Sequence, residues 1–208
     1  VVVTADITTG LVAHYEFEGD TNDSSGNNYH LTTGGIKAYA VGKLGQGYSF
    51  DGLDNNLTAF NTGLSSDSGT VSYWIETNAT ITRTMFISAP DTVSVSFDNY
   101  ITGSDITVHG YGAAAYTVDI NDSTWHHIAV TFDDTNNTVV YIDGSVVGTS
   151  TNIDMNLSTN IFVGHWIGNY QHADMMDDVR IYNRVLSPTD IIGLYNYATP
   201  KLSLKAHG

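Results

Sequence analysis

Short runs of β-favouring residues, separated by turn-forming residues, constrain this chain more than any other feature of its sequence. About a dozen such runs occur, and clusters of Asp, Asn, Gly and Ser that favour turns lie between them. The sharpest signal is Asp143-Gly144, which lies between two β-rich runs and predicts a hairpin. The expected strands cover residues 11–17, 47–50, 70–75, 85–88, 93–97, 106–109, 116–120, 125–132, 138–142, 145–149, 161–163 and 178–182.

Only one segment has the pattern of a helix. Ser187 can serve as the N-cap and Pro188 as the first helical residue of a short helix that extends to about Tyr195. We therefore expect an all-β fold, a two-sheet antiparallel jelly-roll sandwich with one short C-terminal helix. No linker or repeat divides the chain, so we expect a single domain over residues 1–208 with an ordered core at about 8–198.

Alternation within the expected strands indicates which side chains form the core. Trp74 and Trp125 lie on β-rich runs, and burial of their indoles would remove much apolar area from water. We expect both to be core anchors. The other predicted core residues alternate along their strands and are Phe17, Phe50, Ile128, Val130, Phe132, Val140, Ile142, Val179 and Ile181.

The charge of the chain excludes several classes of function. Its 208 residues include 22 Asp and Glu against 7 Lys and Arg, which gives a formal net charge of −15. Phosphate backbones and anionic lipid surfaces would repel such a chain, so nucleic acid is not an expected partner. No run of about 20 apolar residues is present for membrane insertion. The absence of cysteine removes disulfides, thiolate metal sites and cysteine nucleophiles.

Seven motifs in sequence resemble one family over residues 10–195. The chain is similar to the LamG-like jelly-roll family of the concanavalin A-like lectin/glucanase superfamily. The resemblance implies a sandwich of two curved antiparallel sheets, used as a module of secreted or cell-surface proteins that often carries calcium. The motifs are Gly10-Leu-Val-Ala-His-Tyr-Glu-Phe17, Asp23-Ser-Ser-Gly-Asn27, Gly45-Gln-Gly-Tyr-Ser-Phe-Asp-Gly52, Thr70-Val-Ser-Tyr-Trp-Ile75, Trp125-His-His-Ile-Ala-Val-Thr-Phe-Asp133, Tyr141-Ile-Asp-Gly144 and Asp177-Asp-Val-Arg-Ile-Tyr-Asn-Arg-Val-Leu-Ser187.

One stretch departs from the pattern of this family. Before the last strand the family usually has an aromatic residue, a glycine and an isoleucine, whereas this chain has Ala173, Asp174 and Met176. We expect the local geometry to differ there.

The sequence argues against catalysis. Retaining glycoside hydrolysis requires two carboxyl groups about 5–5.5 Å apart on one wall of a cleft. The only glutamates are Glu16, Glu18 and Glu76, and they do not form the Glu-x-Asp-x-Glu strand motif expected of an enzyme in this superfamily. No Gly-x-Ser-x-Gly elbow is present, although spacing alone leaves a Ser-His-Asp arrangement open. We expect no enzymatic activity, and we interpret His126-His127 as structural.

Calcium is the expected cofactor, because this acidic chain is rich in Asp and in loops that offer carbonyl oxygens. The resemblance to related glucanases supports Glu16, Gly19 and Asp177 as a structural site. The alternative is that Asp20 and Asp23 only form turns and that Asp177 only caps a strand. The full set of predicted metal residues is Glu16, Glu18, Gly19, Asp20, Asp23, Asp51 and Asp177.

A second, ligand-linked calcium is a further possibility at rim loops, with oxygens from Asp91, Asp98, Asp105 or Asp174, although none of these loops has an EF-hand spacing.

Aromatic and polar residues in two Gly-rich or polar segments, residues 109–116 and 164–174, form the predicted recognition surface. Sugar rings stack on Tyr and Trp, while Asn, Asp and His bond the hydroxyls. The alternative is that some of these rings only cover the bases of loops. The predicted ligand-binding residues are Tyr111, Tyr116, Trp166, Asn169, Tyr170, His172 and Asp174.

These features together predict a non-catalytic, calcium-stabilised recognition module of an extracellular or cell-surface protein, binding a glycan or another cell-surface ligand. The chain begins Val1-Val2-Val3 without an initiator Met, so we expect it to be part of a larger multidomain chain, and a bacterial adhesin is the favoured parent. Two alternatives stay open. One is a carbohydrate-binding module of a polysaccharide-degrading enzyme, and the other is a protein-binding or structural spacer domain.

Overall fold

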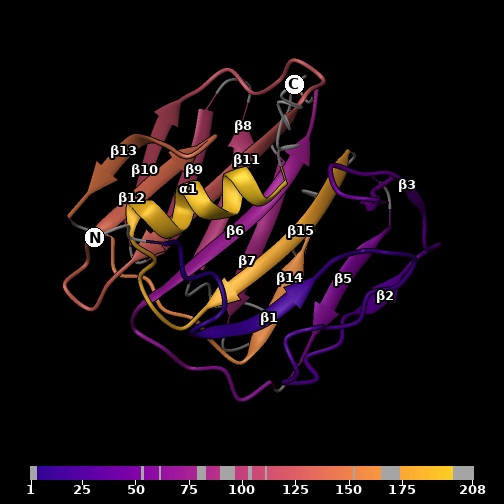
Figure 1. Cartoon of the computed structure of the whole chain (residues 1–208), viewed down its shortest axis with the longest axis horizontal. Helices are drawn as coiled ribbons and strands as arrows, with labels where there is room; N and C mark the ends of the chain where they lie inside the picture. Colours follow the sequence, from indigo (N-terminus) through magenta and orange to yellow (C-terminus); the bar gives the residue numbers. More distant parts are fainter. Residues whose placement is uncertain are drawn as a thin grey trace, which may run out of the picture.

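A computed structural model describes residues 4–52, 54–60, 62–78, 83–89, 97–102, 105–110, 112–151, 153–164 and 174–198. Its described elements are predominantly antiparallel strands with one short helix, as the sequence predicts (Figure 1). In chain order they are β1 (Leu11–Tyr15), β2 (Thr32–Gly34), β3 (Tyr39–Val41), β4 (Gln46–Ser49), β5 (Asn56–Ala59), β6 (Gly69–Glu76), β7 (Arg83–Ala89), β8 (Phe97–Thr102), β9 (Asp105–Gly110), β10 (Gly112–Thr117), β11 (Trp125–Phe132), β12 (Thr138–Ile142), β13 (Ser145–Ser150), β14 (Asn160–Val163), β15 (Met175–Tyr182) and α1 (Pro188–Tyr197).

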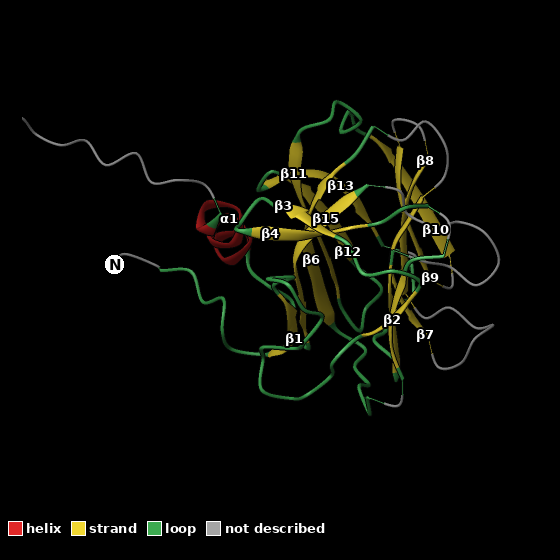
Figure 2. Ribbon diagram, turned by 90° about the vertical axis from the view of Figure 1, so that its right-hand side faces the viewer, coloured by secondary structure: helices red, strands yellow, loops and turns green. Residues whose placement is uncertain are grey.

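The strands form two sheets. Sheet A has eight strands in the order β13-β12-β11-β6-β15-β4-β3, with β1 also paired to β15. Sheet B has seven strands in the order β10-β9-β8-β7-β14-β5-β2. Figure 2 shows α1 on the side of sheet A that faces away from sheet B. The fold is therefore a concanavalin A-like sandwich whose main core lies between the sheets.

The main core contains all nine alternating residues that the sequence assigns to it, from Phe17 to Ile181. A second cluster lies between sheet A and α1, where Ile191 and Leu194 pack against Ala129 and Tyr182. The helix begins as predicted. Ser187 accepts a hydrogen bond from the Asp190 N–H, while the Asp190 carboxylate accepts one from the Ser187 N–H.

The two predicted tryptophan anchors have different environments. Trp74 is buried on the outer face of sheet A and stacks on Tyr195 of α1, with ring centroids 5.7 Å apart. Trp125 is only partly buried, because it is the first residue of β11 and pairs with Glu76 at the end of β6. The prediction of an anchor is therefore confirmed for the burial of Trp74 and wrong for Trp125.

Some strands differ from the sequence prediction. The strands β2, β3 and β5 were not predicted, because each has only three or four residues and β2 and β3 lack a buried alternating face. The strand expected at residues 116–120 is β10, which ends at Thr117. The strand expected at 93–97 falls mostly outside the described residues, and β8 begins at Phe97.

Candidate functional sites

The strand β15 changes partner at Asp177 and Asp178. Its first residues pair with β4, and its last residues, from Val179 onward, pair with β1. Between them the pairing with β6 shifts register, and Asp178 has a φ of 49°. A bulge of this kind redirects side chains, and a left-handed conformation at a non-glycine residue is strained. The local irregularity therefore gives these two neighbouring carboxylates different environments.

Asp177 is fully buried at a pocket of about 170 Å³, which Glu16, Glu18 and Leu44 also line. One carboxylate oxygen, Oδ2, accepts a hydrogen bond of 2.8 Å from the Leu44 N–H. The other oxygen, Oδ1, is buried and has no hydrogen-bond partner. Burial, with the nearby Asp178 charge, raises the pKa of Asp177 to about 7. This carboxylate is therefore short of a positive partner.

The backbone before and at the start of β4 packs tightly against the Asp177 pocket. The turn before β4 approaches so near that a Cβ at Gly42 would lie 2.6 Å from Asp177 Oδ2. Glu18 accepts from the Gln46 N–H at 3.2 Å, and the residue before it, Phe17, has a φ of 55° while its ring lies in the core. The predicted metal residues Glu16, Glu18 and Asp177 thus share one pocket.

Asp178 lines the same pocket, but its carboxylate is held in a buried network of other partners. Its Oδ1 lies 2.6 Å from His14 Nε2 and 3.0 Å from Arg180 Nη2. Burial raises the pKa of Asp178, but the bonds to His14 and Arg180 outweigh it and hold that pKa below its usual range. Ser24 Oγ lies 3.0 Å from His14 Nδ1, which completes a chain of Ser, His and Asp. Ser24 also bonds the His14 carbonyl through its N–H, so we interpret this chain as an anchor for the loop.

The other predicted metal residues lie elsewhere. Asp23 is buried, and its two oxygens accept hydrogen bonds from the N–H groups of His14, Ser25 and Tyr29 and from the Ser25 hydroxyl. Burial opposes these bonds, yet together they lower the pKa of Asp23. This is the turn-forming role that the sequence left open.

The remaining members of the predicted metal set are exposed. Asp20 accepts from the Asn22 N–H at 2.9 Å, Gly19 donates to the Phe17 carbonyl, and Asp51 accepts from the Asp54 N–H at 3.3 Å. In the described part of the chain, no group of three or more His, Asp or Glu side chains is placed to hold a metal ion. A calcium ion at Asp177 would therefore need backbone carbonyls or water as further ligands.

The candidates for a second calcium do not form one group in the described residues. Asp91 lies outside them. Asp98 lies on β8 and Asp105 on β9, at different positions in the register, where Asp98 pairs with His109 and Asp105 with Thr102. Asp174 directly precedes β15, which belongs to sheet A, whereas β8 and β9 belong to sheet B.

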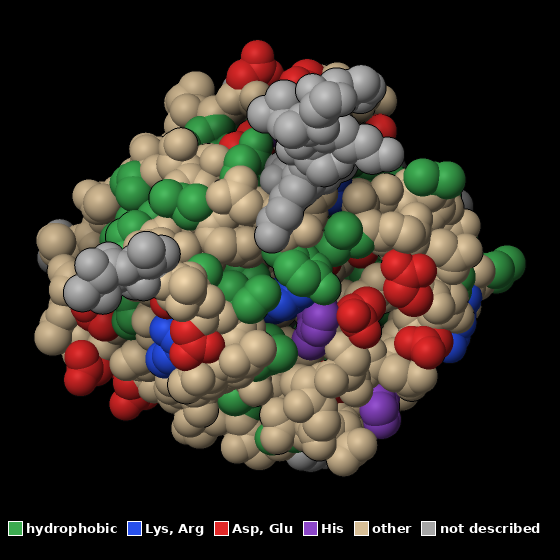
Figure 3. Space-filling model, viewed as in Figure 1, with side chains coloured by type: hydrophobic (Ala, Val, Ile, Leu, Met, Phe, Trp, Pro, Cys, Tyr) green, Lys and Arg blue, Asp and Glu red, His purple; other side chains and the backbone are tan. Residues whose placement is uncertain are grey.

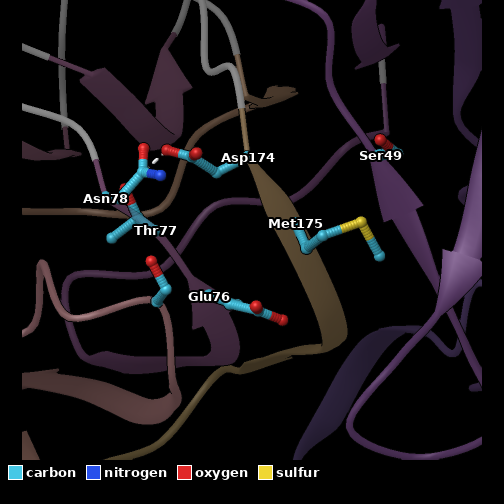
Figure 4. A pocket seen from close by; sticks show the side chains of 7 residues that line it. Ser49, Glu76, Thr77, Asn78, Asp174 and Met175 are labelled. Atoms are coloured by element: carbon cyan, nitrogen blue, oxygen red, sulfur yellow. Dashed lines mark hydrogen bonds between the residues drawn. The ribbon is translucent and has the colours of Figure 1, made fainter.

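Asp174 lines a second pocket, the strand-end pocket, where β6 ends and β15 begins. This pocket of about 230 Å³ is shown in Figure 4. The Asp174 carboxylate points toward Thr77 and Asn78 and accepts a short hydrogen bond from the Thr77 hydroxyl. Its lining residues are Ser49, Glu76, Thr77, Asn78, Ser123, Asp174 and Met175.

Most of the predicted recognition residues cannot be placed. Tyr111, Trp166, Asn169, Tyr170 and His172 lie outside the described residues. Tyr116 lies on β10, where its partly buried ring packs against the main core and contacts Gly148, and burial raises its pKa. Its contact with a ligand stays a prediction.

Five polar residues of the strand-end pocket were not predicted from the sequence as ligand-binding: Ser49, Glu76, Thr77, Asn78 and Ser123. Glu76-Thr77-Asn78 directly follows the predicted strand 70–75, and Asp174 ends the predicted recognition segment. Polar residues at the ends of two strands were the available signal. The pairing of Met175 with Glu76, which brings the two ends together, could not be predicted from either segment alone.

Comparison with known proteins agrees with the fold. The sequence profile of the concanavalin A-like lectin/glucanases superfamily (Laminin_G_3) matches residues 50–192. No curated protein matches the chain. In the described residues, no helix combines the length and apolarity needed to cross a bilayer.

Several solved structures share this fold, among them the following three. Domain 4 of AbnA, an extracellular arabinanase from Geobacillus stearothermophilus, in complex with arabinotriose, is 23% identical, with 89% of this chain and 98% of that chain covered and a TM-score of 0.74. A structure of botulinum neurotoxin type C, whose cell entry is described as dependent on interaction with two ganglioside molecules, is 16% identical, with 93% and 52% covered and a TM-score of 0.73. The binding domain of Paraclostridial Mosquitocidal Protein 1 is 16% identical, with 92% and 53% covered and a TM-score of 0.75. The chain thus spans about half of the toxin structures.

Proposed function

Because the chain belongs to the concanavalin A-like lectin/glucanases superfamily, we propose that it is a non-catalytic carbohydrate-binding domain of a larger extracellular protein. The observation that carries the proposal is the strand-end pocket. Its hydrogen-bonding groups come from the ends of neighbouring strands, and it adjoins the segment in which the sequence predicts sugar-stacking rings. A rigid scaffold that presents polar groups in a pocket is suited to binding a ligand.

The chemistry of the strand-end pocket suits sugar hydroxyls. The Glu76 and Asp174 carboxylates can accept hydrogen bonds, and the Asn78 amide can both donate and accept. Phosphate or sulfate groups would instead meet two carboxylates. The face of the molecule in Figure 3 carries many acidic and few basic side chains, which also disfavours polyanions.

The structural neighbours favour a polysaccharide-degrading enzyme over a bacterial adhesin as the parent protein. Domain 4 of the arabinanase is covered almost completely by this chain and carries an arabinotriose in its structure. We therefore favour a carbohydrate-binding module attached to a polysaccharide-degrading enzyme. The alternatives of a bacterial adhesin and of a protein-binding or spacer domain stay predictions.

Calcium binding at the Asp177 pocket is part of the proposal. The buried Asp177 Oδ1, which has no hydrogen-bond partner, is the kind of hard oxygen ligand that calcium prefers, and the Glu16 and Glu18 carboxylates line the same pocket. The ion would supply the positive charge that this carboxylate lacks. Its role would be structural and not catalytic: the ion would stabilise the bulge of β15, which lies between the residues that pair with β4 and those that pair with β1.

A glycan array followed by calorimetric titration tests sugar binding. We expect a hit among plant-polysaccharide fragments, with affinity reduced about tenfold by Asn78→Ala or Asp174→Asn. Asn78→Ala removes a hydrogen-bonding amide from the pocket, and Asp174→Asn replaces a carboxylate acceptor oxygen by an NH2 donor. Asp122→Asn, an exposed carboxylate beside His126, is the matched control and should leave affinity unchanged. An array with no hit would contradict the proposal and favour a protein-binding or spacer domain.

Melting curves with calcium and with chelator test the ion. At a calcium concentration about a hundred times Kd, the melting temperature should rise by about 5–10 °C. Asp177→Asn should abolish this rise, whereas Asp51→Asn should preserve it, because Asp51 does not line the pocket. Equal melting temperatures with and without calcium would refute the calcium site.

A further inference from the structure

A third pocket lies at the edge of sheet B, where the loop before β2 meets the end of β5. We name it the Phe60 pocket. It has a volume of about 440 Å³, within the ~300–1,000 Å³ range of small-molecule sites. Asn27, Asn28, His30, Thr58 and Phe60 are among its lining residues. No residue predicted from the sequence to bind a ligand lies in it.

Phe60 offers an exposed ring in this pocket. Along β5 the side chains of Leu57 and Ala59 enter the core, so Thr58 and Phe60 lie on the opposite face of the sheet. Phe60 is 52% exposed, and its ring meets the buried Phe162 edge to face at 5.6 Å. A ring fixed by packing can stack on the C–H face of a sugar with little loss of conformational entropy.

The facing wall is held in place by Asp23. The four hydrogen bonds to its carboxylate include those from the N–H groups of Ser25 and Tyr29, which bracket the loop. The Asp23 N–H in turn donates to His30 Nδ1 at 3.0 Å. Asn27 Nδ2 donates to the Val12 carbonyl at 3.1 Å. The loop is therefore ordered before any ligand arrives, which lowers the cost of binding.

The polar groups of the pocket are neutral. None of its nine described lining residues is Asp, Glu, Lys or Arg. Because His30 accepts at Nδ1, its ring carries the proton on Nε2 and can donate from there. The fixed Asn27 amide leaves its Oδ1 as an acceptor. A carboxylated or sialylated sugar would find no cation here, in a chain whose net charge is −15.

We propose that the Phe60 pocket is a second saccharide site, which binds a neutral oligosaccharide by stacking on Phe60 and by hydrogen bonds to the Asn27–His30 loop. The inference rests on the proposed function in one respect, since both sites take a sugar. The two pockets differ in chemistry, because the strand-end pocket contains two carboxylates and the Phe60 pocket contains none.

Calorimetric titration of the full chain with arabinotriose, xylotriose and cellotriose, and with a sialylated ganglioside oligosaccharide, tests this site. We expect at least one neutral trisaccharide to bind, and Phe60→Ala to weaken it by about tenfold or more, as truncation of an anchor does. Phe60→Tyr should restore binding. Val41→Ala, which trims another exposed apolar side chain outside the pocket, should not change it.

A second variant guards against a folding defect. Asn28 has a φ of 62°, so Asn28→Gly keeps the backbone conformation while it removes the amide. It should weaken the same sugar without changing the melting temperature by more than Val41→Ala does. Tighter binding of the sialylated sugar than of any neutral one, lost in Phe60→Ala, would overturn the neutral assignment.

The outcomes separate this inference from the proposed function. Binding that is lost in Asn78→Ala but unchanged in Phe60→Ala and Asn28→Gly would overturn the second site and leave the proposed function standing. Binding lost only in the Phe60 pocket variants would support the second site and move the proposed function away from the strand-end pocket. If neither this panel nor the array shows binding, both fall.

Discussion

The outer faces of the two sheets have contrasting surroundings. Residues in register across β11, β6, β15 and β1 place Ala129, Ser72, Arg180 and His14 in one row on sheet A. All four are buried, three of them are polar, and α1 packs beside them. At the edge of sheet B, by contrast, the exposed Phe60 ring lies in an open pocket beside Thr58.

The polar groups of the two faces have different roles. Buried charges require partners, and on sheet A the ionised groups of Asp178 and Arg180 find each other and His14. The polar groups at the edge of sheet B keep hydrogen-bonding capacity for a ligand. We therefore expect mutations on sheet A to change stability, and mutations at the Phe60 pocket to change binding.

Asp178→Ala should have the largest effect on stability. It leaves the buried Arg180 without its carboxylate partner, and such a loss costs about 3–5 kcal/mol of the free energy of unfolding. Urea denaturation measures it. Asp67→Ala is the control on the surface, because Asp67 is exposed and we expect little change there. If Asp178→Ala lowered the free energy of unfolding as little as the control does, the contrast between the covered face of sheet A and the open edge of sheet B would be wrong.

His127, also on the covered face, should make stability depend on pH. Burial lowers the pKa of His127 from 6.5 to about 4, against the opposing charges of Asp178 and Asp143. Below pH 6.5, His127 takes up a proton in the unfolded chain, whereas in the folded chain it stays neutral until the pH falls to about 4. The free energy of unfolding should therefore fall by about 2 kcal/mol between pH 7 and 4.5 through this group.

The difference between wild type and His127→Gln isolates this contribution, because the other titrating groups are common to both. Urea denaturation at several pH values should show the variant with a shallower decline. If the stability of the wild type and of the variant declined in parallel with pH, His127 would accept a proton in the folded state. The outer face of sheet A would then be less well covered than its contacts indicate.

Ser187→Ala tests how firmly α1 covers sheet A. It removes the side-chain cap that accepts from the Asp190 N–H, which should cost about 1 kcal/mol. Ser187→Asp should recover most of this loss, because Asp also caps helices well. Thermal melting of the three proteins measures the effect, and an equal loss in both variants would contradict the capping role.

Phe60→Ala should have the smallest effect on stability. Half of the ring is exposed, so we expect a loss of about 0.5 kcal/mol or less while sugar affinity falls. Melting and titration on the same sample measure both. A large loss of stability would make Phe60 a structural residue and erase the contrast between the two faces.

Local patterns predicted much of the fold. The bounds of β11 and β12 agree with the expected strands, and α1 begins at Pro188 after the Ser187 cap. These elements have strong alternation or a capping signal in their own sequence. The strands β2, β3 and β5 have neither, since they form where another strand, distant or not, provides a partner.

The candidate sites depended on contacts distant in sequence. The sequence pointed to Asp177, but the different partners of the Asp177 and Asp178 carboxylates result from the bulge and from the change of partner on β15. Asp23 was expected as a metal ligand, and its four hydrogen bonds within residues 14–29 give it a structural role. The Phe60 pocket joins that loop to β5, and no local pattern reports such a meeting.

The contacts of the N-terminal segment with α1 have a mechanical consequence. Asp6 donates its N–H to Asp190 Oδ1 at 2.7 Å, and Arg184 donates to the carbonyls of Asp6 and Thr9. Tension that pulls the N-terminal segment away from α1 would act first on these few hydrogen bonds, before it reached the pairing of β1 with β15. The domain would then lengthen by releasing its first residues while both sheets, and the pockets that their strands line, kept their shape.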